Sequence, residues 1–216
     1  MMPDTSNRRP LASRQTGWAV RTSRWLAGTR VTPNQISMAG MAAALIAGAC
    51  FWAAGSADGA GRVFLLLLAA LFVQGRLLCN LFDGMVAIEA GRASPDGAFW
   101  NEFPDRVSDM LILVGAGLSV ADPALGWAAA AFAFLTAYVR ELGVNTGAGA
   151  DFAGPMAKQH RMAVMTGAAI LAIFEPIWSG QGQVLRAALW IVAIGAALTA
   201  ARRGWRQVER LRSGRN

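Results

Sequence analysis

The feature that most constrains this chain is a succession of apolar segments separated by short polar turns. A helix that crosses a bilayer needs about 20 predominantly apolar residues. The segments that meet or approach this length run over 35–57, 62–90, 97–120, 124–144, 162–178 and 184–201. Hydrophobic residues make up 55% of the chain and charged residues 15%, which is too apolar for an ordinary soluble domain. We therefore expect an all-α integral membrane protein with six transmembrane helices.

The residues before the first apolar segment have a different character. Residues 1–14 are rich in Pro, Ser and Arg, whereas residues 15–30 place Trp18, Trp25 and Leu26 at helical spacing among arginines. This pattern predicts an amphipathic helix lying in the membrane surface, with a solvated basic arm as the alternative. The expected units are a cytoplasmic tail with the interfacial helix (1–31), a six-helix transmembrane domain (32–203) and a basic cytoplasmic tail (204–216).

Two pairs of residues predict local structure inside the transmembrane domain. Thr32 is a suitable N-cap for the first spanning helix, and Pro33 suits its first helical position. Cys50 and Cys79 both lie in apolar segments, so we expect them to be packing residues and not a disulfide.

The basic residues predict the orientation of the chain in the membrane. The formal net charge is +7, and Lys158 is the only lysine. Arginines gather in the two tails and in the loops after residues 90 and 140, whereas the opposite loops offer little beyond Arg62 and Arg186. The positive-inside rule then places both termini on the cytoplasmic side of the inner membrane. Because this distribution is explained by orientation and by anionic lipid headgroups, we expect no nucleic-acid partner.

Carboxylates and amides gather at the junction of the second and third apolar segments, on the predicted cytoplasmic side. Asn80 and Asp83 end one segment, and Asn101, Asp105 and Asp109 repeat every four residues at the start of the next, so they share one helix face. Hard oxygen ligands converging from two helices suit magnesium, manganese or calcium better than zinc. A transporter or channel is an alternative, but a pore would spread polar positions over more spans.

The spacing across this junction resembles the signature of the CDP-alcohol phosphatidyltransferases, D-x2-D-G-x2-A-R-x8-G-x3-D-x3-D. Every gap is kept. The matching positions are Asp83, Gly84, Ala87, Gly97 and Asp105. The departures are Asn80 and Asn101, which replace the first and third aspartates, and Ile88, which replaces the arginine.

The resemblance implies a function and a set of site residues. The family transfers a phosphatidyl or phosphoalcohol group from a CDP-linked donor such as CDP-diacylglycerol to an alcohol acceptor and releases CMP, as a step of phospholipid biosynthesis. It implies Asp105 as the catalytic base, a Mg²⁺ or Mn²⁺ cofactor and a homodimer. The implied metal ligands are Asn80, Asp83, Asn101, Glu102 and Asp105; the nucleotide-binding residues are Asp83, Gly84, Ala87, Arg92 and Gly97; the acceptor-phosphate residues are Arg140, Lys158 and Arg161.

The departures from the signature add further expectations. Glu102 could restore the charge that Asn101 lacks, and Arg92 could replace the cation missing at Ile88. The two asparagines also leave open whether one or two metals bind, and whether the chain is instead a weakened relative that binds lipid or a partner enzyme without turnover. The sequence does not name the acceptor alcohol.

Three charged side chains near the junction raise expectations of their own. Arg76 lies deep in the second apolar segment and requires a partner or a route to water. We expect Asp109 to be a structural carboxylate on the helix face that pairs with Arg106, three residues earlier. Arg140 is expected to pair with Glu141.

Overall fold

The computed structural model describes residues 16–89, 91 and 96–214, and the side chains of Ala98 and Asn101 fall outside that description. Within these residues the regular structure is entirely helical, which agrees with the predicted all-α class. The elements are α1 (Gly17–Ala27), α2 (Pro33–Ala54), α3 (Gly59–Glu89), α4 (Gly97–Ser119), α5 (Pro123–Asn145), α6 (Lys158–Ala172), the short 3-10 helix η2 (Glu175–Trp178) and α7 (Gln183–Arg212).

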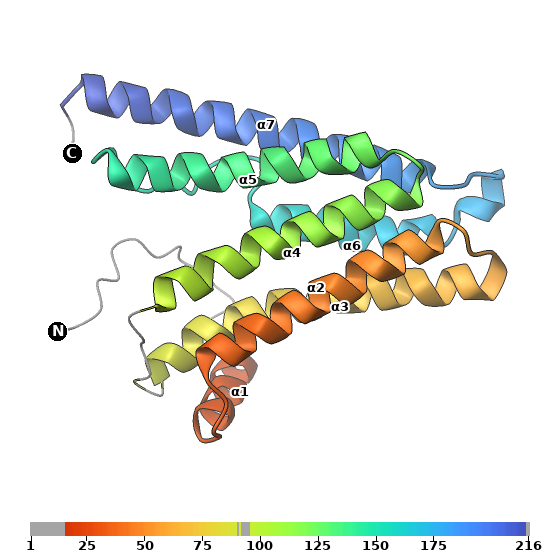
Figure 1. Cartoon of the computed structure of the whole chain (residues 1–216), viewed down its shortest axis with the longest axis horizontal. Coiled ribbons are helices and arrows are strands. Elements are labelled where there is room, and N and C mark those ends of the chain that lie inside the picture. Colours follow the sequence, from red (N-terminus) through yellow and green to blue (C-terminus); the bar gives the residue numbers. More distant parts are fainter. Residues whose placement is uncertain (1–15, 90, 92–95, 215–216) are drawn as a thin grey trace.

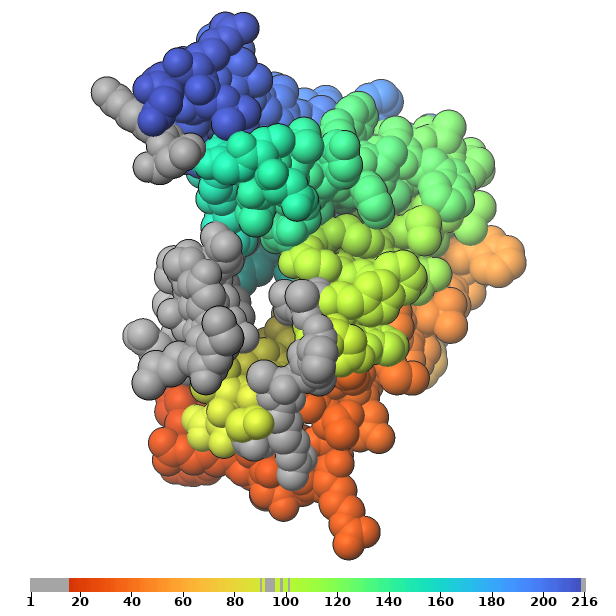
Figure 2. Space-filling view, turned by 60° about the vertical axis from the view of Figure 1, so that its left-hand side comes forward, coloured from red at the N-terminus to blue at the C-terminus, as the bar shows by residue number. Residues whose placement is uncertain are grey.

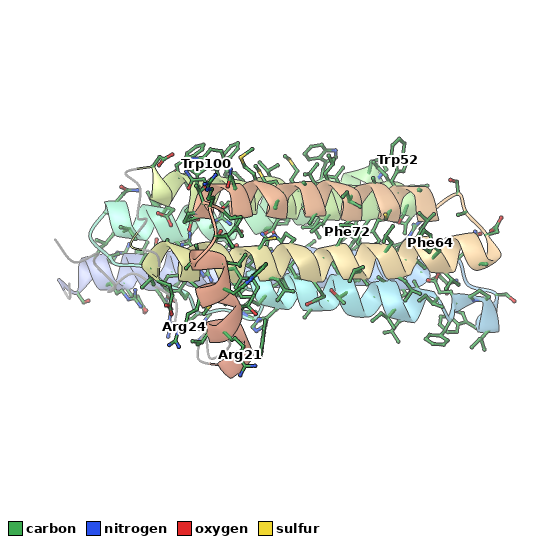
Figure 3. The ribbon with its side chains drawn as sticks, turned by 90° about the horizontal axis from the view of Figure 1, so that it is seen from below. Arg21, Arg24, Trp52, Phe64, Phe72 and Trp100 are labelled. Atoms are coloured by element: carbon green, nitrogen blue, oxygen red, sulfur yellow. The ribbon has the colours of Figure 1, made fainter. Side chains whose placement is uncertain are left out.

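The helices α2 to α7 lie lengthwise in one elongated bundle, and α1 lies across it near one end (Figures 1 and 3). Helix α2 packs against α3 and α4, and α4 continues the contact to α5. Helix α6 packs against both α3 and α7, and α7 also packs along α5. The first residue of α6, Lys158, contacts Asn80 of α3 and Asp105 of α4, so the start of α6 lies beside both helices.

Three of the helices, α2, α3 and α7, are long and apolar enough to cross a membrane. Helices α4 to α6 run beside them in the same bundle (Figure 1), so the expected number of six crossings stays a prediction. The expectation of one continuous helix over 162–178 was wrong, because α6 ends at Ala172 and η2 follows separately. Pro176 lies at the start of η2, where the missing N–H of proline cannot continue the hydrogen-bonding pattern of α6.

Glycines allow α4 to lie directly against its neighbours. A Cβ atom added to Gly115 of α4 would lie 2.3 Å from the carbonyl oxygen of Gly48 in α2. A Cβ atom added to Gly117 would lie 2.7 Å from the Cα atom of Gly126 in α5. Small residues at helix crossings are a common way to bring membrane helices into backbone contact. Helix α4 is thereby fixed between α2 and α5.

The predicted start of α2 is confirmed. The Thr32 hydroxyl accepts a hydrogen bond from the Gln35 backbone N–H (3.2 Å), and the Gln35 side chain accepts one from the Thr32 N–H (3.0 Å). This reciprocal pair is a capping box, and Pro33 occupies the first turn as expected. The prediction of free cysteines is also confirmed, since Cys50 and Cys79 are unpaired.

Helix α1 falls within the segment predicted to be amphipathic. Trp18 packs edge-on against Phe82 of α3 with ring centroids 6.0 Å apart, and Arg24 forms a 3.9 Å ion pair with Glu89. Figure 3 shows Arg21 and Arg24 on the part of α1 that projects from the bundle. The placement of α1 in the membrane surface stays a prediction.

Helix α7 runs past the predicted boundary at residue 203. Arg203 and Gln207 are both 5% exposed. The Arg203 guanidinium donates to the Thr136 carbonyl (2.7 Å), and the Gln207 amide donates to the Val139 carbonyl (2.6 Å). These contacts hold the last turns of α7 against α5, so much of the expected basic tail is part of the helical body.

Candidate functional site

The candidate site lies where α3, α4 and α6 meet. Asn80 and Asp83 come from α3, Asp105 and Asp109 from α4, and Lys158 from the first turn of α6. Figure 2 looks toward this end of the molecule, which is hollowed between the yellow and lime residues of α3 and α4 and the green residues of α5. The convergence of α3 and α4 side chains is what the signature spacing predicts.

The Asp105 carboxylate is the most heavily contacted group of the site. It is 6% exposed, and it accepts a hydrogen bond from the Asn80 side-chain amide (2.9 Å). It also pairs with the Arg76 guanidinium (3.0 Å) and with the ammonium of Lys158. Two cations and one amide from other helices therefore hold this carboxylate in a fixed position.

Asp109 lies one turn deeper on the same face of α4. It is 2% exposed and pairs with Arg76 (3.3 Å) and with Arg161. The expectation that Asp109 pairs with Arg106 was wrong, because Arg106 turns to Glu102 on its own helix. Arg76 is 1% exposed and pairs with both aspartates, so the expectation that it requires a partner is confirmed.

Asp83 differs from the other buried carboxylates. It is 6% exposed and accepts hydrogen bonds from the Ser37 hydroxyl (2.8 Å) and from the Gly84 N–H (2.6 Å). Among the residues that the structure describes, no cationic side chain lies within ion-pair distance of Asp83. Because a buried charge is costly unless it is compensated, Asp83 is the carboxylate of this cluster best suited to an added cation.

The donor set fits a hard cation held by few protein ligands. Within the described part of the chain no group of three or more His, Cys, Asp or Glu side chains is arranged around one metal position. The oxygens that α3 and α4 do bring together are the carboxylates of Asp83 and Asp105 and the amide of Asn80. Magnesium is commonly held in this manner, by one or two carboxylates with substrate phosphates and waters completing the shell.

The remaining predicted ligands of the metal and the nucleotide have varied surroundings. Glu102 pairs with Arg106 and Arg140, so it would have to leave both arginines to bind a metal. Gly97 is the first residue of α4, and Ala87 lies in the last turns of α3. Arg92 and the side chain of Asn101 lie outside the described residues, although the Asn101 backbone is part of α4.

The three residues predicted to bind the acceptor phosphate have different partners in the structure. Arg140 pairs with Glu102 and, as expected, with Glu141 (2.8 Å). Lys158 lies inside the carboxylate cluster. Arg161 is 1% exposed and donates to the Met156 carbonyl (3.0 Å) as well as to Asp109, so it faces the interior of the bundle.

Sequence reasoning missed Ser37. It lies in α2, 46 residues before Asp83, and a single serine in an apolar segment carries no signal of such a contact. Its single hydroxyl proton is shared with the Pro33 carbonyl one turn earlier (3.3 Å), a contact that is common for a serine within a helix. Only the packing of α2 against α3 shows that Ser37 orients Asp83.

A second buried ion pair lies at the other end of the bundle. Arg62 and Glu175 pair there, and the Glu175 carboxylate also accepts hydrogen bonds from the N–H groups of Gly182 (2.8 Å) and Val184 (2.7 Å). This carboxylate therefore caps the start of α7, which explains its burial without a chemical role. A small pocket beside Arg62 is lined by residues of this end and is remote from the carboxylate cluster.

The arrangement of the helices is similar to that of a solved phosphatidylinositol phosphate synthase. The chain is similar to the Mycobacterium tuberculosis enzyme solved with manganese and citrate, with a TM-score of 0.72, 18% identity and 88% of each chain covered. The same enzyme with CDP-DAG bound gives a TM-score of 0.71, covering 87% of this chain and 92% of that one. At this identity the likeness establishes the fold, which is the fold expected from the signature.

Sequence comparison finds a relative of similar length. The inner membrane protein YnbA of Escherichia coli is 28% identical over 179 residues, which cover 82% of this chain and 86% of that protein. No protein-family model matches the chain.

Proposed function

We propose that this protein is a membrane CDP-alcohol phosphatidyltransferase, which moves a phosphatidyl or phosphoalcohol group from a CDP-linked donor to an alcohol acceptor and releases CMP. The observation that carries the proposal is the 2.9 Å hydrogen bond from Asn80 to Asp105. It joins the two halves of the signature across α3 and α4, at the positions where the family places its reacting groups. The fold it shares with a synthase solved with CDP-DAG supports the same function.

The residues present suit the chemistry of the transfer. Asp105 is the proposed general base, which would accept the proton of the attacking hydroxyl. Arg76 and Lys158 hold its carboxylate in place from two other helices. Gly84 and Gly97 would allow the nucleotide to approach the backbone closely, because glycine has no side chain.

A divalent ion, Mg²⁺ or Mn²⁺, is the proposed cofactor. Asp83 would hold it beside Asn80 and Asp105, and the ion would neutralise the diphosphate of the donor and orient it. The manganese in the M. tuberculosis synthase supports this assignment. Ser37 and the Gly84 N–H would keep the Asp83 carboxylate turned toward the ion, since both already contact it.

We further propose that the protein is a multi-pass inner-membrane protein with six crossings, with both termini and the site facing the cytoplasm, and that it forms a homodimer. The distribution of arginines supports the orientation. The relative YnbA, named as an inner membrane protein, supports the location. A CDP-linked donor would be met on the cytoplasmic side.

The test is release of CMP by purified protein in lipid nanodiscs. CDP-diacylglycerol and Mn²⁺ would be supplied with a panel of acceptors that includes glycerol phosphate, serine and inositol phosphate. We expect release with at least one acceptor, and a loss of about 100-fold or more in Asp105→Asn, the scale of general-base catalysis. Asp58→Asn is the matched control, because Asp58 is an exposed carboxylate just before α3.

The outcomes separate an enzyme from a binding protein. Folded protein that binds CDP-diacylglycerol but releases no CMP with any acceptor would overturn the transferase proposal. Equal activity in Asp105→Asn and Asp58→Asn would remove Asp105 from the reaction.

A further inference from the structure

Lys158 occupies an unexpected position for the only lysine of the chain. Its ammonium reaches from the first turn of α6 into the carboxylate cluster, where it contacts the side-chain oxygen of Asn80 and a carboxylate oxygen of Asp105. These are two of the oxygens that the signature assigns to metal binding. An ammonium is a compact point charge with three donors, and it can therefore bridge oxygen ligands in the manner of a bound cation.

Asn80 and Lys158 fit each other chemically. The Asn80 side chain donates through its nitrogen to Asp105 and accepts through its oxygen from Lys158. An aspartate at position 80 could do only the second, and it would bring a negative charge to hydrogen-bond distance of Asp105. The replacement of the first signature aspartate thus agrees with an ammonium that is already in place.

The charges divide the site into two parts. The two asparagines remove two negative charges relative to the signature, which is the charge of one divalent ion. Asp105 is compensated by Arg76 and Lys158, whereas Asp83 has no such partner within the described residues. The part of the site around Asp105 therefore already holds cationic side chains of the protein, whereas the part around Asp83 holds none among the described residues.

We propose that the Lys158 ammonium is a built-in second cation, so that the site binds a single divalent ion at Asp83 and not a pair. The lysine contributes one positive charge beside Asp105, and the bound ion contributes the rest to the diphosphate. This inference rests on the proposed function, because it assigns the cations of that same site. It also gives Lys158 a task inside the cluster that differs from the predicted contact with the acceptor phosphate.

The first test counts bound Mn²⁺ in the full chain in nanodiscs by electron paramagnetic resonance and elemental analysis. The unmodified protein should saturate at one Mn²⁺ per chain. Lys158→Met should bind that ion about tenfold more tightly, because a positive charge near it is gone. Combining Lys158→Met with Asn80→Asp and Asn101→Asp should raise the saturation to two. Lys158→Arg, which keeps the charge, is the control and should stay at one.

A second measurement observes the Lys158 side chain itself. Reductive methylation with ¹³C-formaldehyde labels Lys158 as the only lysine side chain, and its signal is distinguished from the amino terminus by its absence in Lys158→Met. Mn²⁺ should broaden this signal strongly at one equivalent, and Mg²⁺ should not. A sharp signal in protein saturated with Mn²⁺ would show that the ammonium does not lie beside the ion.

The failure of this inference can be told from failure of the proposed function. Release of CMP together with two Mn²⁺ per unmodified chain, or with a Mn²⁺ affinity that is equal in Lys158→Met, would overturn the built-in cation alone. A single bound Mn²⁺ whose affinity rises in Lys158→Met, without any CMP release, would overturn the transferase proposal and leave the assignment of Lys158 as a cation standing.

Discussion

Arg76 offers the sharpest test of how the site is held together. Its guanidinium is 1% exposed and lies 3.0 Å from an oxygen of Asp105, 3.3 Å from one of Asp109 and 3.2 Å from the Asp105 carbonyl. Replacing Arg76 by Met keeps much of the volume and removes the charge. The two aspartates would then lose the cation that they share, while each keeps one other partner, Lys158 or Arg161.

The expected cost is about 3 kcal/mol in the free energy of unfolding. Removing one partner of a buried ion pair costs about 3–5 kcal/mol, and the lower end applies because the second cations remain. Arg106→Met is the matched control, since the Arg106–Glu102 pair is more exposed, at 14% and 33% of the two side chains. Such a pair is worth about 1 kcal/mol or less.

The measurement is denaturant unfolding in mixed micelles, followed by the fluorescence of the eight tryptophans. Asp109→Asn and the double variant Arg76→Met/Asp109→Asn complete a double-mutant cycle. We expect a coupling of about 1–3 kcal/mol, so that the double variant loses less stability than the sum of the single ones. Additive losses, or an Arg76→Met cost equal to that of Arg106→Met, would refute the bridging role.

Other substitutions probe separate parts of the structure. Gly115→Ala should cost about 2 kcal/mol in thermal unfolding, because its Cβ would lie 2.3 Å from a backbone carbonyl of α2; Gly75→Ala, which meets nothing within 4 Å, should not destabilise. Ser37→Ala should weaken Mn²⁺ binding at least tenfold, since the Asp83 carboxylate loses the hydroxyl that orients it; an equal affinity would remove this role. Glu175→Gln should lower unfolding stability by about 3 kcal/mol and leave Mn²⁺ affinity unchanged, because its buried ion pair lies at the opposite end.

The parts of the structure that sequence reasoning predicted are those with local signals. The capping residue Thr32 and the adjacent Pro33 predict the start of α2, because a capping box involves only one helical turn. The four-residue repeat through Asp105 and Asp109 places both on one helix face, and both carboxylates do lie on the buried side of α4. The signature spacing also predicted that α3 and α4 bring Asn80 and Asp105 together.

The contacts that sequence reasoning could not predict join residues far apart in the chain. Asp109 pairs with Arg161, 52 residues away, and not with its near neighbour Arg106. A carboxylate inside the bundle requires a partner because no water is available there. The family resemblance implied that Lys158 contacts the acceptor phosphate, whereas its reach into the cluster depends on how α6 packs on α3. The extension of α7 likewise depends on the contacts of Arg203 with α5.

The central claim is that the side chains gathered by α3 and α4 hold a divalent ion, which in turn holds the diphosphate of a CDP-linked donor. Anomalous diffraction from crystals grown with CDP-diacylglycerol and Mn²⁺ tests it most directly. We predict a manganese peak within about 2.2 Å of an Asp83 oxygen, in contact with the diphosphate. A well-ordered nucleotide with no manganese beside Asp83, or a manganese peak elsewhere on the molecule, would contradict the account.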